Sequence, residues 1–297
     1  MRMDGEDESS NVEDVRGMSG GGGGFGIGGR GIGIGGVAVA LIAGWIFGVN
    51  PLTILGLMSG GGGNSGGQVV QQQTVAPAAP PRSDPQARFV AQILHSTEVA
   101  WTDVFRESGK TYQPPRLVLF SGSWPTACGQ GEAAMGPFYC PNDQKVYIDL
   151  RFFDLLAQKL GAPGQFAQAY VIAHEVGHHV QNQLGIMKKV DALRSRGGEA
   201  QANALSVRVE LQADCFAGVW ANRSQKEQGW RLDPGDIETA LNAAAQIGDD
   251  TLQRKSRGTV VPETFTHGTS AQRVSWFKRG VDGGSVDRCN TFEGRDL

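Results

Sequence analysis

Apolar residues recur at helical spacing through much of the chain after residue 85. Segment 87–107, for example, has the distribution of polar and apolar residues that an amphipathic helix shows. Two runs rich in aliphatic residues, 116–120 and 145–150, predict strands. Periodicity and capping signals predict further helices at 152–160, 164–184, 202–222, 233–247 and 270–280. The pattern therefore predicts an α+β domain over residues 86–297.

The first 85 residues follow a different pattern. Residues 1–30 mix acidic residues with glycine and offer few apolar side chains to bury, so we expect a flexible segment. Residues 31–58 carry no charged residue and are long enough to cross a bilayer, which takes about 20 apolar residues. Residues 59–85, rich in glycine, glutamine and proline, are expected to form a flexible linker.

The limits and nature of the apolar segment stay open at this point. Asn50 and Pro51 interrupt it, which leaves a span of either 31–49 or 37–58. A cleaved signal peptide is an alternative, although the long acidic stretch ahead of the apolar run is unusual for one. A buried core helix is a third interpretation, but glycine-rich flanks leave it nothing to pack against.

The distribution of basic residues predicts an orientation. Arg2, Arg16 and Arg30 precede the span, and no lysine or arginine follows it before Arg82. By the positive-inside rule, the protein would cross the cell membrane once, with its N-terminus in the cytoplasm and the 86–297 domain outside. The net charge of −3 and the lack of a basic stripe give no support to nucleic-acid binding.

The most specific motif is His174-Glu175-Val176-Gly177-His178, an H-E-x-x-H arrangement in the predicted helix 164–184. On a helix the two histidines share one face and can hold a zinc ion together. Glu175 lies about 100° further round the axis, where it can hold a water molecule instead. The alternative, three ordinary surface side chains, fits poorly with apolar flanks on both sides, because buried polar groups need partners.

A catalytic zinc site usually takes a third protein ligand. The candidates are His95, His179, His267 and the acidic residues further along the chain. Glu210 in the predicted helix 202–222 is the preferred one, because it belongs to a stripe of mostly small residues that a second helix can approach. Asp214, one turn later, could accept the second N–H of a zinc-bound histidine. The alternative is a pair of carboxylates on a solvated helix face.

Residues 174–181, His-Glu-Val-Gly-His-His-Val-Gln, and 210–220, which begin Glu-Leu-Gln-Ala-Asp, resemble the bacterial family of neutral zinc metallopeptidases. Shorter stretches at 10–14, 126–129, 136–141 and 266–270 are also similar to it. The resemblance implies a zincin-like domain, with an active-site helix and a small sheet, behind the predicted transmembrane helix. It also implies one catalytic Zn²⁺ ion on His174, His178 and Glu210, with Glu175 as the acid/base.

These residues lead us to expect an endopeptidase that hydrolyses peptides or proteins with a zinc-activated water and Glu175 as proton carrier. His267, in a loop before the last helix, would steady the oxyanion or else cap that helix at Ser270. We expect Arg273 to pair with a carboxylate. A non-catalytic zinc-stabilised envelope protein and an amidase acting on cell-wall peptides are alternatives. No heptad or charge pattern in the sequence specifies an oligomeric partner.

By the same resemblance to zincin folds, the strand at 145–150 would line the cleft and accept an extended peptide by strand addition. The alternative is a plain edge strand with Asp149 exposed to solvent.

The four cysteines are Cys128, Cys140, Cys215 and Cys289. None belongs to a C-x-x-C pair, so a zinc site made of four thiolates is not expected. An even number on the outer side of a membrane suggests two disulfides. Of three possible pairings we expect Cys128–Cys140, which brackets a short glycine-containing loop, and Cys215–Cys289, which would tie the Glu210 helix to the C-terminal region. Four free thiols in a reducing compartment are the alternative.

Overall fold

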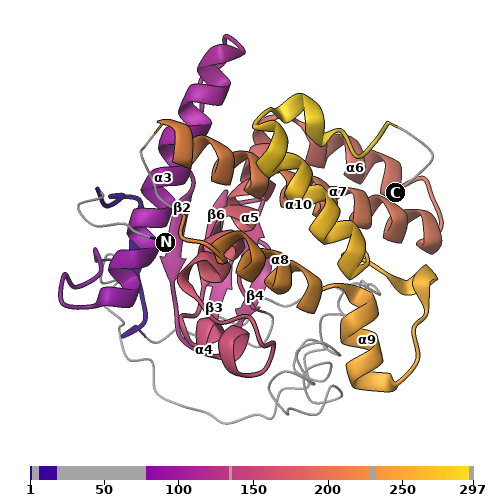
Figure 1. The fold of residues 1–297 in the computed structure, drawn as a ribbon, viewed down its shortest axis with the longest axis horizontal. Helices are drawn as coiled ribbons and strands as arrows, with labels where there is room; N and C mark the ends of the chain where they lie inside the picture. Colours follow the sequence, from indigo (N-terminus) through magenta and orange to yellow (C-terminus); the bar gives the residue numbers. More distant parts are fainter. Residues whose placement is uncertain (2–6, 19–77, 134–135, 228–231, 294–297) are drawn as a thin grey trace, which may run out of the picture.

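The computed structural model describes residues 1, 7–18, 78–133, 136–227 and 232–293. The predicted membrane span, 31–58, and the linker up to residue 77 lie outside the described residues. Among the helices that are described, none combines the length and apolar character needed to span a bilayer. The described part is a mixed fold in which helices surround a small sheet, as the hydrophobic pattern predicts (Figure 1).

The main sheet has four strands in the order β1-β2-β6-β5. Their bounds are Val12–Asp14 for β1, Arg116–Leu119 for β2, Lys145–Ile148 for β6 and Phe138–Cys140 for β5. β1 and β6 run parallel to β2 on its two sides, and β5 is antiparallel to β6. A separate hairpin pairs β3 (Ser123–Thr126) with β4 (Gly129–Glu132).

The strand predicted at 145–150 is a central strand, so its interpretation as the edge strand of the sheet is wrong. β5 covers the side of β6 that would have been free. Asp149 is only 3% exposed, and it accepts hydrogen bonds from the Gly122 amide and the Arg151 guanidinium. β5 was not predicted because it has only three residues, too few for a visible alternation of polar and apolar positions.

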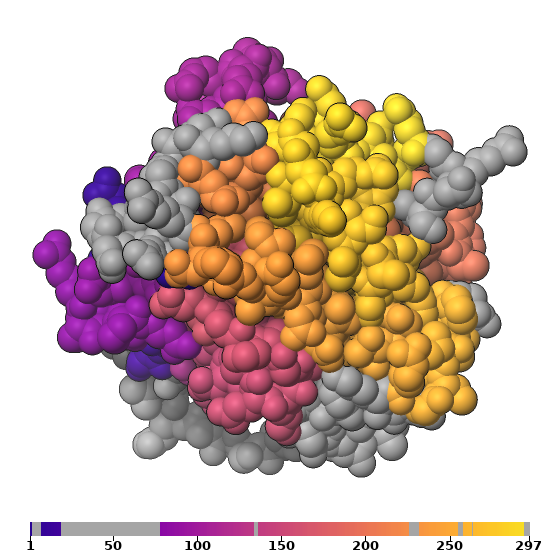
Figure 2. Space-filling model, viewed as in Figure 1, coloured from indigo at the N-terminus to yellow at the C-terminus, as the bar shows by residue number. Residues whose placement is uncertain are grey.

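Eight helices of the described residues surround the sheet: α3 (Pro85–Glu107), α4 (Arg151–Gln158), α5 (Gln165–Gln183), α6 (Ile186–Arg194), α7 (Glu199–Glu227), α8 (Asp236–Gln246), α9 (Asp249–Arg257) and α10 (Ser270–Gly283). The six predicted helices are all present, whereas α6 and α9 were not predicted. Helix α5 lies at the centre of the fold, in contact with α3, α7, α8 and strands of the sheet (Figure 1). The C-terminal third of the chain covers much of one face (Figure 2).

Helix α5 ends as the sequence predicts. Gly185 follows it with φ of +74°, a left-handed conformation that glycine adopts without the steric cost of a side chain. Helix α8, in contrast, begins at Asp236, three residues after the start of the predicted segment 233–247.

Three glycines allow the helices around α5 to approach one another closely. A Cβ on Gly177 would lie 3.1 Å from the carbonyl oxygen of Ala213, so α5 and α7 touch at this point. A Cβ on Gly218 of α7 would overlap the backbone of α10, and a Cβ on Gly280 of α10 would overlap that of α7. The ribbons of α7 and α10 accordingly lie side by side in Figure 1. This packing fixes the position of α10 relative to the helix that carries Glu210.

Residues 7–18 belong to the fold, although residues 1–30 were expected to be flexible. Val12 and Val15 are buried, at 5% and 1% exposure. The Leu117 amide donates to the Asn11 carbonyl over 2.9 Å, and the Asp14 amide donates to the carbonyl of Ala78 over 2.8 Å. A three-residue strand whose partner is more than 100 positions away leaves no periodic signal, which is why the sequence did not predict it.

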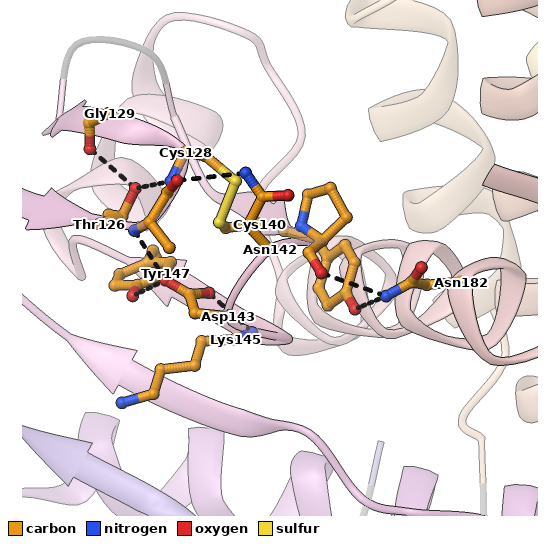
Figure 3. The surroundings of a disulfide bond; sticks show 12 residues. Thr126, Cys128, Gly129, Cys140, Asn142, Asp143, Lys145, Tyr147 and Asn182 are labelled. Atoms are coloured by element: carbon orange, nitrogen blue, oxygen red, sulfur yellow. Dashed lines mark hydrogen bonds between the residues drawn. A yellow bond between two sulfur atoms is a disulfide. The ribbon is translucent and has the colours of Figure 1, made fainter. Parts of the chain in front are cut away.

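Both expected disulfides are confirmed. Cys128–Cys140 joins the turn between β3 and β4 to the end of β5 (Figure 3). Asn182 on α5 donates to the Tyr139 hydroxyl over 2.9 Å and to the carbonyl of Pro141, so β5 is also attached to the central helix. Cys215–Cys289 joins α7 to the 3₁₀ helix Val286–Cys289 near the C-terminus.

Candidate metal centre

The three predicted metal ligands lie together. His174 and His178 project from α5 and Glu210 projects from α7, and one ligand atom from each falls within 4.8 Å of the other two. Nε2 of His174 is 3.2 Å from one carboxylate oxygen of Glu210, and Nε2 of His178 is 3.5 Å from the other. The two histidines are 6% and 8% exposed. The spacing of four residues on α5 and the close contact of α5 with α7 produce this arrangement.

A buried hydrogen-bond network orients His174 on the side away from Glu210. Its Nδ1 lies 2.8 Å from Asp214, the partner that the sequence predicted. Asp214 also accepts hydrogen bonds from the Tyr170 hydroxyl, over 2.6 Å, and from two nitrogens of Arg273, each over 2.9 Å. Arg273 thus pairs with a carboxylate, as expected. With Nδ1 engaged by Asp214, Nε2 is the nitrogen of His174 that faces the shared site.

His178 has a partner of its own that the sequence analysis missed. Its Nδ1 lies 2.9 Å from the side-chain oxygen of Gln181, and the amide of Gln181 donates to the carbonyl of Val209 and to Gln212. Gln181 is fully buried. A signal was present: Gln181 is three residues after His178 on the same helix, and a glutamine among apolar neighbours requires a hydrogen-bond partner.

The electrostatics of the cluster favour a cation. Burial alone would lower the pKa of His174, but the carboxylates of Asp214 and Glu210 outweigh it and raise that pKa to about 10. Burial would raise the pKa of Glu210, yet His178 and His174 hold it well below its usual value. Positive charge is therefore stabilised where the three side chains meet. The donor set fits zinc, because it consists of two imidazole nitrogens and one carboxylate. Each of these groups also has hydrogen-bond partners or an opposite charge beside it.

Glu175 and His267 line the same cavity, which has a volume of about 460 Å³. Glu175 is 7% exposed, and burial raises its pKa to about 7. A carboxyl group that titrates near neutrality is suited to accept and return a proton at that pH. Most of the other lining residues are apolar, including Phe138 of β5, Phe152 of α4 and Leu252 of α9.

His267 is positioned by Asp249, a second residue that the sequence analysis missed. Nδ1 of His267 is 3.3 Å from one carboxylate oxygen of Asp249. The other oxygen accepts hydrogen bonds from the amides of Thr266, His267 and Gly268. His267 does not cap the last helix; Thr269 does, in a capping box with Gln272. Asp249 begins α9, which was not predicted, so no signal pointed to this pair.

The remaining histidines have other environments. His179 is buried between the Tyr139 hydroxyl and the carbonyl of Gln113, and it does not line the cavity. His95 lies partly exposed on α3, 3.7 Å from Glu98. Neither belongs to the cluster of potential metal ligands found among the described residues.

Comparison with known proteins identifies the family. A sequence model of the family described as "Putative neutral zinc metallopeptidase" matches residues 1–292, and the chain belongs to this family. It is 53% identical over 296 residues to the uncharacterized protein YpfJ of Escherichia coli (strain K12), covering 98% of this chain and 99% of YpfJ. It is 45% identical over 195 residues to the uncharacterized protein Rv2575 of Mycobacterium tuberculosis (strain H37Rv), covering 63% and 65% of the two chains. No solved structure matches the chain.

Proposed function

We propose that this protein is a zinc-dependent endopeptidase that hydrolyses peptide bonds in peptides or proteins. The observation that carries the proposal is the convergence of His174, His178 and Glu210 at the wall of an open cavity that also holds Glu175. A zinc ion held by these three ligands supplies Lewis-acid chemistry, because it acidifies water and polarises a carbonyl group.

The side chains of the cavity have distinct tasks in this proposal. Glu175 accepts the proton of the attacking water and passes it to the leaving amine, for which its pKa of about 7 is well suited. His267, held by Asp249, places a hydrogen-bond donor where the oxyanion of the tetrahedral intermediate develops. Asp214 and Gln181 keep the two histidines in the orientation that binds metal.

The cavity is bordered by a strand with which an extended peptide can pair. Phe138 and Tyr139 of β5 contribute to its wall, and β5 is the last strand of the sheet on that side. We therefore propose that an extended substrate peptide pairs with β5 rather than with β6, because the outer edge of β5 is not paired with another described strand.

The direct test is zinc content and proteolysis of a generic substrate such as casein, measured on the full chain and on Glu175→Gln. The full chain is required because residues 7–18 belong to the fold. We expect about one zinc ion in both proteins and a fall in turnover of about 10²- to 10⁴-fold in the variant. Glu199→Gln, an exposed carboxylate in the first turn of α7, is the matched control and should behave as the wild type.

Three results would count against the proposal. Full activity of Glu175→Gln would remove the assigned proton carrier. Zinc in both proteins with no activity in either would leave a metal site without the peptidase, and would favour the non-catalytic envelope protein. A chain without zinc affinity would contradict the metal centre itself.

We further propose that the domain resides in an oxidising compartment outside the cytoplasm, attached to the membrane through residues 31–58. The two disulfides and the uncharged character of this segment support the proposal. We also propose an orientation that differs from the one expected from the basic residues. The pairing of β1 with β2 supports an arrangement in which residues 12–14 and the domain lie on the same side of the membrane.

A further inference from the structure

Arg194 is a cationic side chain in the wall of the cavity that the proposed mechanism does not use. It is the last residue of α6, and it lines the cavity together with Met187, Val209 and the proposed site residues. The only carboxylates among the described lining residues are Glu175 and Glu210. Arg194 therefore adds a positive charge to a cavity whose wall is otherwise mainly apolar.

The two arginines of the cavity differ in how far they are neutralised. Arg273 is 2% exposed and donates two hydrogen bonds to the fully buried Asp214. Among the described residues, the carboxylate paired with Arg194 is that of Asp191, at 3.7 Å, and the side chain of Asp191 is 71% exposed. An ion pair at that distance in solvent contributes little. Asp214 is thus a full counter-charge for Arg273, whereas Arg194 lacks an equivalent.

The guanidinium of Arg194 also has unused hydrogen-bonding capacity. One terminal nitrogen donates to the Ser206 hydroxyl over 2.7 Å. Its Nε is buried and has no hydrogen-bond partner among the described residues. A guanidinium offers five N–H donors in a planar fork, and that fork matches the two oxygens of a carboxylate. The side chain is 35% exposed, so a ligand in the cavity can reach it.

The contact with Ser206 relates the position of Arg194 to that of Glu210 along α7. Ser206 precedes Glu210 by four residues on α7, a rise of about 6 Å along the helix axis. An extended peptide advances about 3.5 Å per residue, so this rise corresponds to about two residues of substrate. We propose that Arg194 is a specificity-determining residue that binds a substrate carboxylate about two residues from the bond to be cut. The inference rests on the proposed peptidase function and names its substrate class.

Two sources supply such a carboxylate: an aspartate or glutamate side chain within the peptide, or the C-terminal carboxylate of a short one. The probes are alanine- and leucine-based octapeptides, blocked at both ends, with Asp, Asn or Lys placed in turn at each internal position. A second set contains no charged side chain and ends in either a free carboxylate or an amide. Binding is measured by competition on the full-length, zinc-loaded Glu175→Gln protein, and cleavage on the wild type.

We expect Asp to bind about 10- to 100-fold more tightly than Asn at one position, or the free carboxylate to exceed the amide by a similar factor. Adding Arg194→Gln should reduce that ratio to less than about twofold. Arg194→Glu should reverse the preference in favour of Lys. Arg196→Gln, an exposed arginine two residues away that does not line the cavity, is the matched control and should preserve the ratio.

Equal binding of the acidic and neutral peptides to the protein that retains Arg194 would overturn the inference. A preference for the acidic peptide that persists after Arg194→Gln would also overturn it, as would failure of every peptide to bind. A merely structural role for Arg194 would lower all affinities together and leave the ratio unchanged. Because binding is measured without turnover, the two proposals fail separately. Selective binding without cleavage by the wild type would contradict the peptidase function and retain the carboxylate site.

Discussion

At the scale of single residues, the candidate metal centre depends on side chains that never touch the metal position. Gln181 and Asp214 each hold one histidine by its Nδ1, and Asp249 holds His267 in the same way. A histidine that is free to rotate loses orientation and the correct tautomer, so such outer partners commonly change metal affinity 10- to 100-fold.

We expect Gln181→Leu to weaken zinc binding by about 10- to 100-fold, because His178 loses the acceptor that fixes its ring. The measurement is a competition titration of the full chain against a zinc chelator of known affinity. Gln183→Leu is the control on the same helix, since Gln183 contacts Gln113 and not a metal ligand. Equal zinc affinity of the two variants would show that Gln181 does not orient His178.

Asp249→Asn tests the contact between Asp249 and His267. We expect zinc content to stay at the wild-type level and turnover to fall by about 10- to 100-fold, because His267 loses the carboxylate that orients it. Steady-state kinetics should place the loss in kcat rather than in KM, as an interaction made in the transition state requires. An unchanged kcat would show that the Asp249 carboxylate does not support the role proposed for His267.

At the scale of elements, the site is set by how closely α5, α7 and α10 pack. The sequence predicts these helices from the spacing of apolar residues and from signals at their ends, although α7 extends beyond both ends of the predicted 202–222 segment. The H-E-x-x-H motif lies within α5. Glu210 and Asp214 were predictable because they occur one turn apart on a single helix. Gln181 left a weak signal, but Asp249 depends on a loop contact that no local pattern records.

The contact between α7 and α10 should be sensitive to a single methyl group. We expect Gly280→Ala to destabilise the protein by at least about 1–3 kcal/mol, since its Cβ would overlap the Cys215 backbone and force α10 away from α7. The shift would also draw Arg273 away from Asp214 and weaken zinc binding. Gly198→Ala is the control, because nothing lies within 4 Å of its Cβ position. Chemical denaturation of both variants measures the difference, and equal stabilities would contradict the close packing.

At the scale of the whole molecule, the N-terminal strand constrains the membrane attachment that we propose for residues 31–58. Residues 7–18 are attached at several points: Ser9 and Asn11 both donate to Glu98, Lys145 pairs with Glu13 over 2.8 Å, and Val12 is buried. A single crossing by residues 31–58 would place these partners on opposite sides of the bilayer and break every one of these contacts. The arginines that flank residues 31–58 favour such a crossing, but their positions in the sequence do not show that β1 pairs with β2.

We therefore expect residue 10 and residue 110 to be accessible from the same side. All four native cysteines are in disulfides, so Ser10→Cys and Lys110→Cys each introduce one free thiol at an exposed position. Intact cells expressing either variant are treated with a membrane-impermeant maleimide, and lysed cells give the maximum labelling of each thiol. Labelling of both thiols, or of neither, agrees with the paired strand, and labelling of both also places the domain outside the cytoplasm. Labelling of residue 110 with protection of residue 10 would mean that the chain crosses the membrane once and that β1 does not pair with β2 in the cell.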